Sequence, residues 1–144
     1  MLQAAAIACG HRKSPLSVAR LVELAAHPSN EVRYGASYGL AGEDEPAAVA
    51  ALVLLSKDQD RDVRDWATFA LGSQTDLDTS ELREALRARL ADDDPEIRGE
   101  ALVGLSRRHD EHLKNAVLEE LSGEFHGDWA FEAAEAMAMP STEN

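Results

Sequence analysis

The amino-acid sequence contains one cysteine, few aromatic side chains and no long apolar run. The lone thiol, Cys9, cannot form an internal disulfide, so the fold does not depend on an oxidising compartment. No window reaches the roughly 18 consecutive apolar residues of a membrane-spanning helix. No basic residues precede the first apolar run, as they would in a signal peptide. These absences predict a cytoplasmic protein with no membrane partner.

Basic side chains are also scarce, since 14 Lys and Arg stand against 27 Asp and Glu, which gives a net charge of −13. The charges are unevenly distributed along the chain. Residues 1–42 carry four basic and two acidic side chains (net +2), whereas residues 43–144 carry ten and 25 (net −15). Binding to a phosphate backbone normally depends on several Lys or Arg contacts, and an acidic surface repels it. The charge therefore predicts that nucleic acid is not a partner.

Helix-forming Ala and Leu are abundant, and no segment shows the two-residue alternation that is typical of a strand. Instead, a ten-residue pattern starts at Val32, Val63, Ile97 and, more weakly, Trp129, which are 31, 34 and 32 residues apart. In each copy an alanine follows four residues after this anchor, and Leu or Met follows eight residues after it. These positions share one helical face, so the pattern predicts four amphipathic helices.

A second apolar pattern precedes each anchor and predicts another helix in every unit. Pro15 and Pro46 stand at the first position of two of these helices, and Asp60 and Asp94 are good caps for the helices that carry the anchors. Each hairpin is too short to bury both of its faces, so neighbouring hairpins must stack into one domain. The predicted units are a half-repeat at 1–13, repeats at about 14–42, 43–73, 74–107 and 108–139, and a tail at 140–144.

The segment DRDVRDWATFALG, residues 60–72, carries the repeat most fully. Its motif residues are Asp60, Asp62, Val63, Arg64, Ala67, Ala70, Leu71 and Gly72. This motif resembles bacterial HEAT repeats of the phycobilisome-lyase-like type, and the resemblance covers about residues 14–139. It implies an all-α fold, a right-handed α-α superhelix of about four hairpins whose second helices line the concave face. It does not define the function, because HEAT arrays serve as scaffolds, enzymes and nucleic-acid binders.

The segment AAAIACG, residues 4–10, is similar to the end of a second helix but has no first helix before it. Its apolar side chains would face solvent unless another segment covers them, and terminal repeats normally need a polar cap. Two interpretations follow. Either the chain is the C-terminal, end-capping part of a longer solenoid, or two copies associate through this half-repeat.

The concave face that the resemblance implies would carry the side chains two, three and six residues after each anchor. They are mostly aromatic in the first two repeats and largely acidic in the later ones. The candidate protein-binding residues are Tyr34, Tyr38, Asp65, Trp66, Phe69, Glu100, Val103, Phe131, Glu132 and Glu135. This composition favours a protein or peptide segment with apolar anchors and Lys or Arg. Trp66 has two open roles, packing of its ring in the core or contact with the partner through its indole N–H.

An arginine follows each of the first three anchors, at Arg33, Arg64 and Arg98. Their recurrence in register predicts a ladder of salt bridges along the stack, in which each arginine pairs with an acidic residue of a neighbouring turn or unit, such as Asp62 or Glu96. We interpret this ladder as a structural feature rather than a binding site.

Catalytic chemistry finds no support in the sequence. The HEAT-repeat deoxyhypusine hydroxylases bind two iron ions through His-Glu pairs two and three residues after the anchor, and no histidine stands at those positions here. His109 and His112 alone are too few ligands for a metal site, and no phosphate-cradling loop or nucleophile motif is present. We therefore expect a non-enzymatic scaffold without a metal or cofactor. An accessory or lyase-type subunit acting on a protein-bound tetrapyrrole is the alternative.

Overall fold

The computed structural model describes residues 15–122, together with Glu135 and Ala138. Residues 15–122 form seven α-helices and no β-strand. The helices are α2 (Pro15–Leu24), α3 (Asn30–Leu40), α4 (Pro46–Leu55), α5 (Arg61–Ser73), α6 (Ser80–Arg89), α7 (Pro95–Arg107) and α8 (Leu113–Ser122). The predicted half-repeat and tail lie outside the described residues.

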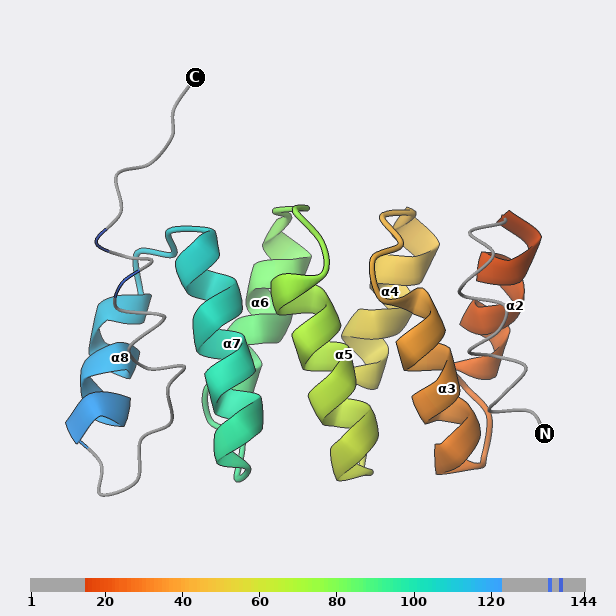
Figure 1. Cartoon of the computed structure of the whole chain (residues 1–144), viewed down its shortest axis with the longest axis horizontal. Helices are drawn as coiled ribbons and strands as arrows, with labels where there is room; N and C mark the ends of the chain where they lie inside the picture. Colours follow the sequence, from red (N-terminus) through yellow and green to blue (C-terminus); the bar gives the residue numbers. More distant parts are fainter. Residues whose placement is uncertain (1–14, 123–134, 136–137, 139–144) are drawn as a thin grey trace.

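Successive helices pair into hairpins that stand side by side in two layers (Figure 1). One layer consists of α3, α5 and α7, and the other of α2, α4 and α6. Helices of the first layer contact one another more extensively than those of the second, and α5 with α7 most of all. Closer packing in one layer is expected on the inner side of a curved stack, so we call these the inner layer and the outer layer. The all-α solenoid fold is confirmed.

Side-chain caps define the starts of three helices. The carboxylates of Asp60 and Asp94 each accept hydrogen bonds from two backbone N–H groups, and the Thr79 hydroxyl accepts one. Ser29 and Glu45 also stand at N-cap positions, but neither side chain makes a capping hydrogen bond. The inner helices α5 and α7 are therefore the ones held by an aspartate at their first turns.

The core lies between the two layers and follows the predicted periodicity. The anchor Val63 and the alanine four residues later, Ala67, are fully buried. Glycines permit the closest helix contact. A Cβ atom added to Gly104 of α7 would lie 2.5 Å from the Cα of Gly72 on α5, so a larger residue does not fit unless the helices move apart. These two glycines explain why α5 and α7 pack so closely.

Two of the three arginines of the predicted ladder, Arg33 and Arg64, form salt bridges with aspartates in the turns between the two layers. Arg33 makes two hydrogen bonds to the carboxylate of Asp58, at 2.7 and 2.9 Å, and Arg64 makes two to Asp92, at 2.8 and 3.2 Å. Each aspartate lies in the helix-helix turn of the following hairpin. Burial alone would raise the pKa of both carboxyls. Both pKa values are nevertheless lowered, because an arginine and a backbone N–H hydrogen-bond to each carboxylate.

Arg33 and Arg64 thus pair with an acidic residue of a neighbouring turn, as expected, but the two examples that we named, Asp62 and Glu96, are not these partners. Asp62 and Glu96 stand in the exposed first turns of α5 and α7, and both contact Arg61 instead. The ladder arginines reach the turns before those helices, so their partners lie earlier in the sequence. Arg98 also contacts the turn before its own helix, because its guanidinium donates a hydrogen bond to the backbone carbonyl of Asp92.

The repeat pattern did not predict that the guanidinium of Arg108 is buried against the C-terminal end of α5. Arg108 makes five hydrogen bonds to backbone carbonyls, four of them within residues 71–77. Burial lowers the pKa of Arg108. The carbonyls at the end of α5 lie at the negative end of its dipole, which stabilises the buried cation. Arg108 thereby joins the end of α5 to the end of α7.

Candidate protein-binding surface

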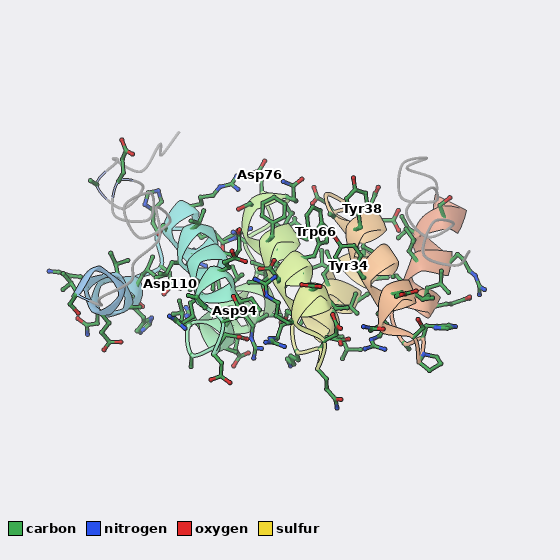
Figure 2. All side chains as sticks on the ribbon, turned by 60° about the horizontal axis from the view of Figure 1, so that its bottom comes forward. Tyr34, Tyr38, Trp66, Asp76, Asp94 and Asp110 are labelled. Carbon is green, nitrogen blue, oxygen red and sulfur yellow. The ribbon has the colours of Figure 1, made fainter. Side chains whose placement is uncertain are left out.

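Four aromatic side chains from α3 and α5 come together on the inner layer. The ring of Trp66 stacks on Tyr38 with centroids 5.1 Å apart, and it tilts against Phe69 at 5.2 Å and against Tyr34 at 6.3 Å. Figure 2 shows Tyr34, Tyr38 and Trp66 side by side between the two helices. We call these four residues the aromatic cluster. Contacts of this kind stabilise a fold by about 0.5–1.5 kcal/mol per pair beyond the burial of area.

Trp66 is the centre of the aromatic cluster, and all four side chains remain partly exposed. The indole Nε1 atom of Trp66 is buried and has no hydrogen-bond partner among the described residues. The ring of Trp66 therefore packs within the cluster, and contact of its indole N–H with a partner stays a prediction. What the cluster presents to solvent is the exposed part of its rings.

A network of charges borders the aromatic cluster at the N-terminal ends of α5 and α7. Arg61 makes salt bridges with Asp65 at 3.5 Å and with Asp94 at 2.8 Å, and it also contacts Asp62 and Glu96. Burial raises the pKa of Asp65, Arg61 opposes this effect, and the neighbouring carboxylates add to it. One cation thus serves four carboxylates, and Asp65 is already engaged within the protein.

Beside Tyr34 the inner layer is hollowed by a shallow depression of about 200 Å³. Its lining residues are Asn30, Glu31, Tyr34, Asp60 and Asp62, from the start of α3 and the start of α5. Asp60 accepts a hydrogen bond from Asn30 at 2.7 Å in addition to capping α5. Glu31 is exposed and makes no ion pair with any described residue. The aromatic cluster is therefore bordered by negative charge on this side.

Val103, which we expected on the exposed strip, belongs to the buried side of α7. Its side chain is only 8% exposed, and it lies in an unbroken run of buried residues from 101 to 106. A buried side chain has little free surface with which to contact a partner. The prediction that Val103 lies on the exposed surface is therefore corrected.

The other acidic candidates lie outside the aromatic cluster or outside the described residues. Glu100 of α7 is partly exposed, and Glu135 is exposed. The predicted contact residues Phe131 and Glu132 lie outside the described residues. Among the described candidates, the structure brings together the four aromatic side chains of α3 and α5, with Asp65 in the charge network beside them.

The histidines near α8 belong to a turn. The Nδ1 atom of His112 lies 3.6 Å from the carboxylate of Asp110, which also forms salt bridges with Arg83 and Arg87 of α6. In the part of the chain that the structure describes, no three His, Cys, Asp or Glu side chains are grouped to hold a metal ion. Of the helices described, none is both long and apolar enough to cross a membrane.

The sequence and the fold both define a HEAT-repeat protein. A family model for HEAT repeats matches residues 1–72 and 54–138, so the chain belongs to this family. It is similar to Protein YibA of Escherichia coli K12 and of Escherichia coli O157:H7, at 32% identity over 127 residues in each case. These matches cover 85% of this chain and 45% of the relatives, so the chain spans less than half their length.

A solved structure agrees with this assignment. The X-ray structure of YibA from Escherichia coli matches with a TM-score of 0.76 and 30% sequence identity. The match covers 94% of this chain and 49% of that one. The fold and the family are therefore shown, and the function has to be argued from the surface.

Proposed function

We propose that the protein is a non-catalytic scaffold that binds a segment of a partner protein on its inner layer, over the aromatic cluster. The partner segment carries an apolar or aromatic side chain and, near it, Lys or Arg. The observation that carries this proposal is the row of partly exposed rings across α3 and α5, with carboxylates along one border. Nucleic acid is not the proposed partner, because that border repels phosphate.

Packing within the fold requires contacts among the rings, whereas binding requires that part of the rings is exposed. Trp66 satisfies packing, since its ring touches all three others. Packing does not require Tyr34, Tyr38 and Phe69 to stay partly exposed on one surface. Single exposed apolar residues are ordinary, but aromatic side chains gathered over two helices are typical of binding hot spots. A negative border would speed the encounter with a basic segment and favour it over other partners.

A library of random peptides displayed on phage, selected on the immobilised protein, tests the proposal without a known partner. We expect the selected peptides to combine an aromatic or large aliphatic residue with Lys or Arg. Their affinity should fall as the salt concentration rises, because salt screens exposed charges. The double variant Tyr38→Ala/Phe69→Ala should weaken binding at least about tenfold, as removal of hot-spot rings does.

Leu118→Ala is the matched control, since it removes an exposed apolar side chain from α8, outside the aromatic cluster. Circular dichroism should show that both variants keep the helical fold. Peptides that bind the double variant as tightly as the unchanged protein would contradict the proposed surface, and so would equal losses in the double variant and the control.

The phycobilisome-lyase-like type, the tetrapyrrole-related role, the cytoplasmic location and the place of these repeats in a longer solenoid stay predictions from the sequence. The tetrapyrrole role has a direct test. A shifted absorption band after mixing the protein with a bilin would support it, and an unchanged spectrum would contradict it.

A further inference from the structure

Helix α4 of the outer layer has no polar side chain, because its sequence is PAAVAALVLL. No other described helix lacks polar side chains. A helix that is apolar on every side is normally buried on every side. Nevertheless, Ala47, Ala50 and Leu54 of α4 are exposed. Leu54 is 63% exposed, more than any other large apolar side chain in the described residues.

The neighbouring outer helices carry charge on their exposed faces. Helix α2 exposes Arg20 and Glu23, and α6 exposes Glu84 and Arg87. These side chains are what a solvated helix face ordinarily carries. The apolar outer face of α4 is therefore a property of one hairpin and not of the repeat, which points to a surface that is covered when the protein is assembled.

A groove of about 390 Å³ runs between α4 and α6 next to this face. Val53, Ala85 and Ala88 supply its apolar lining, and their short side chains leave the space open. The volume exceeds the roughly 150 Å³ of an engineered apolar cavity that holds benzene, so it has room for a leucine side chain. Leu54 follows Val53 in the sequence, so a projecting apolar side chain and a groove that accepts one occur on the same helix.

The two ends of the groove carry opposite charges. Helices α4 and α6 are the first helices of successive hairpins and run in the same direction. Lys57 follows the end of α4, whereas Glu81 and Glu84 lie in the first turns of α6, so the cation and the carboxylates stand towards opposite ends. Within the described part of the chain, neither Lys57 nor Glu84 takes part in an ion pair.

We propose that the face formed by α4 and α6 joins two copies of this chain in a two-fold symmetric dimer. A two-fold axis perpendicular to the groove sets the two grooves antiparallel. Leu54 then enters the groove of the partner subunit, and Lys57 meets the two carboxylates at its far end. Shape and charge are thus self-complementary, as an interface between identical patches requires. This face lies on the outer layer, so the dimer does not depend on the function proposed for the aromatic cluster.

Sedimentation equilibrium from about 1 μM to about 1 mM tests the dimer over the range expected of a weak association. The net charge of −13 on each copy calls for about 0.15 M salt, which screens repulsion over a Debye length of roughly 8 Å. We expect a monomer–dimer equilibrium whose dissociation constant rises at least about tenfold in Leu54→Glu.

The matched control is Leu118→Glu, which places the same charge at the other exposed large apolar residue, on α8. It should leave the dissociation constant unchanged. A monomer at every concentration would overturn the proposal. A dimer that Leu54→Glu does not weaken, or that both variants weaken equally, would also overturn it, because the interface would then lie elsewhere, as at the N-terminal half-repeat.

Charge exchange tests the antiparallel arrangement. Lys57→Glu alone, and Glu81→Lys/Glu84→Lys alone, should each weaken self-association, because like charges then meet at both ends of the interface. A mixture of these two variants pairs opposite charges at both ends, so we expect a heterodimer. All three positions are at the surface, and circular dichroism should confirm that the variants are folded. Folded variants that form no heterodimer would overturn the arrangement.

Discussion

Asp92 offers the most direct test of how neighbouring repeats are held together. Its side chain is only 5% exposed, and its carboxylate accepts hydrogen bonds from Arg64, from Arg89 and from the backbone N–H of Asp94. The substitution Asp92→Ala leaves the Arg64 guanidinium, which is 17% exposed, without its carboxylate. Loss of one partner from a buried ion pair lowers the free energy of unfolding by about 3–5 kcal/mol. Because Arg64 keeps its hydrogen bond to the carbonyl of Asp58, we expect about 2–3 kcal/mol.

The salt bridge between Arg20 and Glu23 on α2 provides the matched control. Its atoms are 2.6 Å apart, yet its side chains are 58% and 64% exposed. Exposed pairs contribute about 0–1 kcal/mol because water screens the charges and both side chains lose freedom. We therefore expect Glu23→Ala to change the free energy of unfolding by less than about 0.5 kcal/mol.

Urea unfolding followed by far-UV circular dichroism measures both effects. A double-mutant cycle with Asp92→Ala and Arg64→Met isolates the pair, since methionine keeps part of the packing of the arginine stem. We expect a coupling energy of at least about 1 kcal/mol. A coupling energy near zero, or a loss in Glu23→Ala as large as in Asp92→Ala, would refute the reasoning that burial decides the strength of these pairs.

Three further predictions concern stability. Gly104→Ala should lower the free energy of unfolding, measured with urea, by about 1–3 kcal/mol. The steric cost against Gly72 exceeds the roughly 1 kcal/mol that alanine gains over glycine in helix propensity. A more stable variant would contradict this. His109→Gly should stabilise by about 0.5–1 kcal/mol, because His109 has a positive φ of 48°, and an unchanged or lower thermal midpoint would count against it. The third prediction concerns pH. Burial alone would raise the pKa values of Asp58 and Asp110, but hydrogen bonds from arginine and backbone N–H groups outweigh burial, so both pKa values are lowered. Their stabilisation is thus present above about pH 4 and lost as the pH falls through the folded-state values; urea unfolding that does not vary between about pH 6 and 3 would contradict this.

The helices were predictable because their signals are local. An anchor with apolar residues four and eight positions later lies on one face whatever the rest of the chain does, and Val63 and Ala67 are buried accordingly. The caps at Asp60 and Asp94 were also readable, since each carboxylate bonds backbone groups within three residues. The grouping of aromatic residues from α3 and α5 followed from the same repeat register.

The details of the candidate surface were not predictable in the same way. Periodicity placed Val103 at a position equivalent to Phe69, but the Val103 side chain is buried in the folded chain. It also placed Trp66 at the boundary of the core, but it did not show that the indole Nε1 atom is buried. Both outcomes depend on how deeply one helix sits against the next.

The sequence by itself determined the helices, their order and the two-layer hairpin array, because 3.6-residue periodicity and capping act within a few residues. Only the tertiary structure decided that Arg64 meets Asp92, that Arg108 joins the ends of α5 and α7, and that α4 leaves an apolar face in solvent. These contacts depend on the offset and the tilt between neighbouring hairpins. That geometry arises from the packing of side chains across the whole stack, which no short stretch of sequence encodes.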